Sequence, residues 1–206
     1  MKNKRYSMSF TTGSLFYKES LILATLYLES NDWKVVREKV VSGNVLQART
    51  LNTLQRVCRE IISRLKTLSA HELALLINTN PLDQGYLLWL ALCRRYEFLA
   101  DFAVEVLRER FISLKTDLHI EDYEIFFNRK SEWHPELNEI RPATRKKLRQ
   151  VLFKILREVD LLGSDNTIKA ALLSPRLAEI IVSGNCQEIQ LFPIFDVSLR
   201  SDEVGK

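Results

Sequence analysis

The sequence predicts an all-α protein, folded as one or more compact multi-helix bundles. Apolar residues recur at intervals of three and four along most of the chain, which places them on one face of a helix. Glycine and proline fall at the apparent ends of these segments rather than inside them. The chain has 206 residues, 46% of them hydrophobic, so it is long enough to bury a core in one domain or two small ones.

Each helix expected in the first part of the chain has a recognisable start or end. Asp32 and Ser69 are favourable N-cap residues, and Glu72 stands at the capping-box position after Ser69. Gly43 and Asn44 are typical residues for the end of a helix. The expected helices cover residues 15–29, 33–42, 50–66 and 69–78.

The next helix is expected to begin at Pro81, because the missing N–H of a proline costs nothing in the first turn. It contains the longest apolar run, Tyr86 to Cys93, which is far shorter than the ~18 residues that a membrane-spanning helix needs. We therefore expect a buried core helix and no membrane span. Further helices are expected at residues 98–111, 120–127, 141–162 and 174–182, with a possible short C-terminal β-strand at 188–195.

These elements suggest three parts. We predict an N-terminal helical subdomain over residues 1–78 and a C-terminal helical subdomain over residues 79–200. Residues 201–206 are expected to form a disordered tail.

Positive charge is concentrated in two segments, although the net charge is only +4. Residues 31–66 hold eight basic and three acidic residues, and residues 141–160 hold seven and two, so each segment carries +5. Residues 67–140, between them, hold thirteen acidic and seven basic residues and carry −6. Two basic segments around an acidic middle are typical of a protein that binds a polyanion.

The second basic segment is expected to form one amphipathic helix. Leu148, Leu152 and Ile155 fall on its apolar side, and Phe153 lies toward the basic side, where it could stack on a base or pack on another helix. Most of its cations lack an acidic partner at i,i+4, so an anionic ligand or the acidic middle segment must compensate for their repulsion; both interpretations stay open. The predicted nucleic-acid contacts are Arg145, Lys146, Lys147, Arg149, Lys154 and Arg157.

Residues 33–64 are similar to a helix-turn-helix, with phosphate- and base-binding side chains at the start of the second helix. The connection from Gly43 to Arg49 is longer than the usual turn, and a plain helical hairpin explains the pattern equally well. Arg64 is expected to pair within the fold instead. The predicted contacts in this segment are Arg49, Thr50, Asn52, Thr53, Arg56 and Arg59.

Motifs for nucleotide or zinc chemistry are missing. The six glycines are isolated, which excludes a Walker A loop and a G-x-G-x-x-G loop. His134 and Glu136 match half of a zinc-deaminase signature whose P-C-x-x-C half does not follow. The three cysteines are far apart and form no C-x-x-C pair, which favours a reducing compartment and argues against a disulfide framework or a zinc site.

One acidic group has two interpretations. Asp117, Glu121, Asp122 and Glu124 could hold Mg²⁺ for a nuclease, but carboxylates are also ordinary first-turn residues beside a positive helix terminus. The second interpretation is favoured. We therefore expect no enzyme activity, no cofactor, no resident metal and a cytoplasmic location.

Five blocks of the chain resemble the BrxA family of the bacteriophage exclusion (BREX) defence systems. They are residues 6–13 (YSMSFTTG), 63–69 (SRLKTLS), 87–96 (LLWLALCRRY), 102–111 (FAVEVLRERF) and 144–158 (TRKKLRQVLFKILRE). The resemblance implies a non-enzymatic, mostly helical component of an antiviral operon with a fold similar to that of the antitermination factor NusB. It also implies double-stranded DNA as a partner, together with other BREX subunits, namely a methyltransferase and large ATPase-type components.

The resemblance and the charge pattern coincide on the basic helix at residues 145–157, whereas the contacts at residues 49–59 rest on the residues alone. The leading hypothesis is a DNA-binding accessory protein of phage defence that contacts mainly the phosphate backbone. The alternative is a protein-interaction scaffold that docks larger BREX subunits without functional DNA binding.

Overall fold

A computed structural model describes residues 5–195 and confirms the all-α prediction. No sheet forms in this range, and the β-pairing there consists of two isolated bridges, Asp117 with Thr167 and Leu162 with Ile168. None of the helices in the described range is long and apolar enough to cross a membrane. The expected likeness to NusB stays a prediction.

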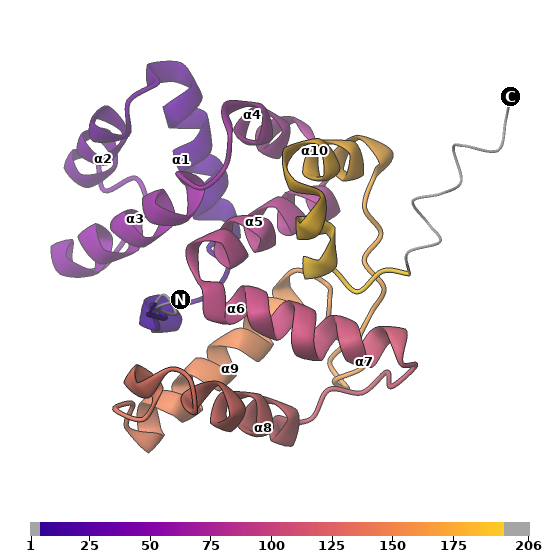
Figure 1. Ribbon diagram of the computed structural model, residues 1–206. Coiled ribbons are helices and arrows are strands. Elements are labelled where there is room, and N and C mark those ends of the chain that lie inside the picture. Colours follow the sequence, from indigo (N-terminus) through magenta and orange to yellow (C-terminus); the bar gives the residue numbers. More distant parts are fainter. Residues whose placement is uncertain (1–4, 196–206) are drawn as a thin grey trace, which may run out of the picture.

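The N-terminal helices α1 to α3 form one end of the molecule, with α2 and α3 outermost (Figure 1). The side chain of Asp32 accepts a hydrogen bond from the Lys34 N–H, and Ser69 and Glu72 form the predicted capping box. These observations confirm two of the expected helix starts. The bounds are η1 Ser9–Thr11, α1 Tyr17–Ser30, α2 Trp33–Ser42, α3 Leu51–Leu65 and α4 Ala70–Asn78.

Helix α5 lies near the middle of the molecule (Figure 1), where it packs against α1, α3 and α4, and it begins at Pro81 after the Asn80 cap, as predicted. The residues from Tyr86 to Cys93 are at most 3% exposed, which confirms a buried core helix. The bounds are α5 Pro81–Arg95, α6 Glu97–Phe102, α7 Glu109–Ile112, α8 Ile120–Ser131, η3 Pro135–Leu137, α9 Pro142–Glu158, α10 Pro175–Asn185 and η4 Cys186–Leu191.

The helix expected at residues 98–111 forms, but its middle is wound more widely. A π-helical segment, η2 Ala103–Arg108, joins α6 to α7. Such segments are rare and short. Glu105 lies in this segment and pairs with Lys130 and Arg129 of α8 at 2.6 Å each, so it ties η2 to α8.

The basic helix α9 ends earlier than predicted. We expected it to run to about residue 162 and to stop at Gly163, but it ends at Glu158. Asp160 adopts the left-handed conformation, with φ 58°, and the N–H groups of Leu161 and Leu162 both bond to the carbonyl of Leu156. Helix ends usually place glycine at such a position, so no residue type in this segment indicated the earlier end.

The C-terminal part of the described chain also differs from the prediction. The possible strand at residues 188–195 does not form, because 3-10 helix η4 continues to Leu191. The Trp89 indole N–H donates to the Leu191 carbonyl at 3.0 Å, which holds η4 against the core helix α5. The predicted tail at 201–206 lies outside the described residues, and the boundary between residues 78 and 79 stays a prediction.

Candidate nucleic-acid interface

The first basic segment places exposed cations along α2, α3 and their connection, with the exposed Glu38 among them on α2. On α3, Leu54, Cys58 and Ile61 face the core, which directs Asn52 and Arg56 outward. Seven side chains of this surface are exposed, and none has a hydrogen bond or ion pair among the residues described. We call them the α2–α3 basic surface: Lys34, Arg37, Lys39, Arg49, Arg56, Arg59 and Lys66.

The two predicted threonine contacts serve the start of α3. The Thr50 hydroxyl accepts a hydrogen bond from the Thr53 N–H at 3.2 Å and lies 2.9 Å from the Thr53 hydroxyl. This is an N-cap arrangement, which satisfies a backbone donor that the helix leaves free. Thr50 and Thr53 are exposed beside Arg49 and Asn52.

The connection between α2 and α3 spans residues 43–50. Within it, the Asn44 side chain donates to the Ala48 carbonyl at 3.2 Å and accepts from the Ala48 N–H at 3.0 Å. This connection is longer than the three or four residues of a helix-turn-helix, so the hairpin alternative describes its length better.

Arg64 does not belong to this surface and pairs within the fold, as predicted. Its guanidinium group binds Glu60 at 2.7 Å and donates to the Ser14 carbonyl at 2.8 Å. Only 3% of Arg64 is exposed. It therefore ties α3 to the segment before α1.

The second predicted surface, on α9, is largely compensated by other residues of the chain. Arg145 and Arg149 both form ion pairs with Glu124, which lies on α8 in the acidic middle segment. Lys146 and Lys147 are exposed, and no side-chain partner for either is found within residues 5–195.

The last two predicted contacts of α9 also have partners. Lys154 lies 3.6 Å from Glu158, and Arg157 donates to the Asn166 side chain at 2.6 Å. Phe153 is 6% exposed, so it packs in the core rather than presenting a face for base stacking.

A groove separates α8 from the first two turns of α9, and we call it the α8–α9 groove. Its volume is about 530 Å³. The two helices line it at spacings of three and four, so one face of each helix is turned toward the other. The lining residues are Glu124, Phe127, Asn128, Ser131, Leu137, Asn138, Ile140, Pro142, Arg145, Lys146 and Arg149.

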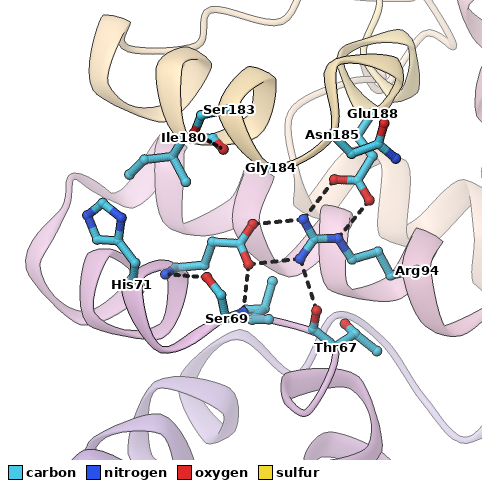
Figure 2. Close-up of a pocket in the computed structure, with 11 residues that line it drawn as sticks. Thr67, Ser69, His71, Arg94, Ile180, Ser183, Gly184, Asn185 and Glu188 are labelled. Carbon is cyan, nitrogen blue, oxygen red and sulfur yellow. Dashed lines mark hydrogen bonds and ion pairs between the residues drawn. The ribbon is translucent and has the colours of Figure 1, made fainter.

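A second pocket of about 530 Å³ lies between α4, α5, α10 and η4, and its charged groups are bound to one another (Figure 2). Arg94 contacts Glu72 and Glu188, each through two hydrogen bonds of 2.7–2.8 Å, and also donates to the Thr67 carbonyl. We call this three-residue cluster the Arg94 clamp. Every guanidinium nitrogen of Arg94 has a partner, so the clamp joins three elements and leaves no donor for a ligand.

Three of the four carboxylates considered for Mg²⁺, all but Glu121, form ion pairs with arginines of the chain. Arg110 pairs with Asp122 at 2.8 Å and with Asp117 at 3.2 Å, while Glu124 faces α9. Within the described chain, no group of three or more His, Cys, Asp or Glu side chains is placed to hold a metal ion.

His134 and Glu136, the residues of the zinc-deaminase half-signature, make contacts that hold the N-terminal segment. The His134 ring stacks on Tyr6 with a centroid distance of 3.8 Å, and its Nδ1 lies 3.2 Å from the Glu136 carboxylate. Glu136 also accepts a hydrogen bond from the Tyr6 N–H at 2.6 Å. Hydrogen bonds from Tyr6 and His134 outweigh partial desolvation and lower the pKa of Glu136.

Sequence reasoning did not name four of the seven cations of the α2–α3 basic surface. Lys34, Arg37, Lys39 and Lys66 contributed only to the segment charge of +5. Helical wheels of α2 and α3, read together with that charge, would have predicted that these four cations are exposed. The α8–α9 groove had no such signal, because it depends on how two helices pack.

Comparisons with known proteins agree on one family. The family model described as BrxA matches residues 4–185. The chain is 27% identical to "BREX protein BrxA" of Escherichia coli O9:H4 (strain HS), over 82% of this chain and 80% of that one. It is 25% identical to "BREX protein BrxA" of Paramagnetospirillum magneticum (strain ATCC 700264 / AMB-1), over 89% of each chain.

A solved structure has a similar fold. The crystal structure of an uncharacterized protein from Magnetospirillum magneticum superposes with a TM-score of 0.78, covering 91% of this chain and 97% of that one at 23% sequence identity. The family match extends over nearly all of the described residues, from the N-terminal segment to the end of α10. The chain therefore belongs to the BrxA family of BREX proteins.

Proposed function

We propose that this protein is a non-enzymatic, cytoplasmic accessory component of a BREX phage-defence system that binds double-stranded DNA mainly through the phosphate backbone. The observation that carries this proposal is the α2–α3 basic surface, where seven exposed cations have no partner within the described chain. Unpaired cations on adjacent helices repel one another, and a polyanion removes that repulsion while releasing its own counterions.

The residues of this surface favour backbone contact over base reading. Lysine and arginine on the outer sides of α2 and α3 provide charge, and Asn52 and Thr53 at the start of α3 add hydrogen-bonding groups. Contacts of this kind set the position of a protein on DNA and carry little sequence information. Lys146 and Lys147 on α9 extend the proposed contact at a second place.

The proposed partners follow from the same family. Relatives are named BREX proteins, so we infer that the chain works with other BREX subunits, including the methyltransferase and the ATPase-type components. A protein that holds DNA without altering it would position such subunits on their substrate.

The direct test compares two double variants by titration into labelled duplex DNA, single-stranded DNA and duplex RNA at two salt concentrations. We expect Arg56→Ala/Arg59→Ala to weaken duplex binding and to reduce the salt slope by roughly 1.8, about 0.9 for each phosphate that is no longer neutralised. The control is Lys115→Ala/Arg176→Ala, which removes the same charge from exposed positions outside α2 and α3. Equal affinities of the two double variants would contradict this assignment.

A scaffold that docks larger BREX subunits without functional DNA binding is the second candidate. Two large apolar side chains favour it: Trp133 is 70% exposed and Ile125 is 65% exposed, both on or just after α8. Capture of BREX subunits that survives nuclease treatment and is lost in Trp133→Ala/Ile125→Ala would support this candidate. Capture that nuclease abolishes would support DNA as the link.

A further inference from the structure

We propose that the α8–α9 groove is a second phosphate-binding site for DNA and that Glu124 occupies the place of the phosphate in the free protein. The inference deepens the proposed function and rests on it. It assigns phosphate binding to Arg145 and Arg149, which pair with Glu124 in the free protein. The groove contains three cations and one carboxylate, so its lining keeps a net charge of +2.

The position of Glu124 shows which ligand the two arginines accept. Arg145 and Arg149 lie one turn apart on α9, and each pairs with a different oxygen of the Glu124 carboxylate. The Arg145 guanidinium also lies over the Phe127 ring, 4.1 Å from its centroid, which limits its movement. Two guanidinium groups around one anionic group form the arrangement that binds a phosphate.

The carboxylate leaves this cluster incompletely satisfied. The Arg145 Nε is buried and has no hydrogen-bond partner within the described chain. Buried polar groups are nearly always paired, so this orphaned Nε indicates that the resident carboxylate does not use all the donors of the two arginines. A phosphate has more acceptor oxygens than a carboxylate.

The start of α9 adds a third source of positive potential. Pro142 occupies the first turn and lines the groove, and no side chain caps this end of the helix. The free N–H groups and the helix dipole of a 17-residue helix therefore act on the same side as Lys146. A backbone phosphate in the groove would meet Arg145, Arg149, Lys146 and this terminus together.

Displacement of Glu124 is feasible because the pair is accessible. The side chain of Glu124 is 34% exposed, and those of Arg145 and Arg149 are 24% and 19% exposed. Because these side chains are partly exposed, the Glu124 carboxylate competes with an incoming phosphate for the two arginines but does not block access to them. Glu124 therefore lowers the affinity for DNA, and its removal strengthens binding.

The test measures duplex DNA affinity for Glu124→Gln against Glu121→Gln. Both variants remove one negative charge from α8, but Glu121 is exposed and has no side-chain partner in the described range. We expect Glu124→Gln to bind about threefold more tightly than Glu121→Gln, with a salt slope steeper by roughly 0.9 for each additional phosphate that the variant neutralises. Adding Arg145→Ala/Arg149→Ala to Glu124→Gln should abolish the increase in affinity.

Thermal melting by circular dichroism shows whether each variant folds, and Glu124→Ala replaces Glu124→Gln if the latter does not. If the wild type binds duplex DNA while Glu124→Gln and Glu121→Gln bind equally, the inference is wrong and the proposed function stands. If neither the wild type nor Glu124→Gln binds duplex DNA at low salt, the proposed function fails and the inference fails with it.

Discussion

Glu72 is the residue in the described chain whose ionisation is tied most clearly to stability. Its side chain is 4% exposed and receives hydrogen bonds from Arg94 and from the Ser69 N–H. Burial alone would raise its pKa, but the hydrogen bonds from Arg94 and Ser69 outweigh burial and hold the pKa below the ordinary value of 4.5. Its charge therefore contributes to folding wherever the carboxylate is ionised in both the folded and the unfolded states.

We predict that Glu72→Gln lowers the free energy of unfolding by about 3 kcal/mol at neutral pH, because it leaves Arg94 partly unpaired. A group with a lowered folded pKa stabilises above its unfolded pKa, near 4.5, and loses that contribution as the pH falls through the folded value. The stability gap between variant and wild type should therefore shrink below about pH 4.5 in urea titrations. Glu179→Gln, at an exposed position on α10, should show no such gap.

Among single residues, Arg145 shows that the sequence predicts which side of a helix a cation lies on but not its ion-pair partner. Its position on the cationic side of α9 followed from the helical period. Its pairing with Glu124, 21 positions earlier, depends on the packing of α8 against α9, and no local rule contains that distance. Arg64 was easier, because Glu60 stands at i,i+4 on the same helix.

Among the elements, α7 ends in a strained conformation. Leu114 follows the helix with φ 58°, and the N–H of Lys115 bonds back to the Arg110 carbonyl. A leucine in the left-handed region costs about 1 kcal/mol or more, and the exposed fraction of this side chain is 75%, so little packing compensates.

We predict that Leu114→Gly raises the free energy of unfolding by about 0.5 kcal/mol, since relief of strain exceeds the added entropy of the unfolded chain. Leu172→Gly is the matched control, because Leu172 is 71% exposed and is not among the residues with positive φ. Chemical denaturation of both variants checks the sign. A loss of stability in both would show that the strain at Leu114 is already compensated.

Element starts were more predictable than element ends. Ser69 with Glu72, and Asn80 with Pro81, are short patterns that act on the adjacent backbone, and both mark helix starts as expected. The end of α9 was misplaced because Asp160, rather than a glycine, takes the left-handed conformation. The π-helical segment Ala103–Arg108 had no signal in the periodicity of the sequence.

For the whole molecule, the contacts of α5 bear on whether the predicted parts unfold separately. Buried residues of α3, α4 and α5 belong to one hydrophobic cluster, and the Arg94 clamp joins α4 to α5 and η4. These contacts cross the predicted boundary between residues 78 and 79.

We therefore predict a single cooperative unfolding transition. Tryptophan fluorescence should follow the same urea curve as far-UV circular dichroism, both in the wild type and in Trp33→Phe, which restricts the signal to Trp89 and Trp133. Two separated transitions would support independent subdomains at residues 1–78 and 79–200.

The fold class was predictable because the helical period of apolar residues extends along most of the sequence. The family resemblance was also recognisable, because its blocks are spread along the chain. The arrangement of charge was predictable only by segment. Which cations stay unpaired is a property of the packed molecule, since α8 covers part of α9 while α2 and α3 are left open.

The two partners of the Arg94 clamp are synthesised at very different times. Glu72 precedes Arg94 by 22 positions, whereas Glu188 follows it by 94, so a growing chain holds the arginine and its first partner long before the second exists. At a synthesis rate of roughly 5–20 residues per second, that interval lasts on the order of 5–20 seconds. Throughout it, Arg94 and the Trp89 N–H lack partners that only the C-terminal segment supplies. The nascent chain therefore completes its core late, with one side of α5 left uncovered until η4 has been synthesised.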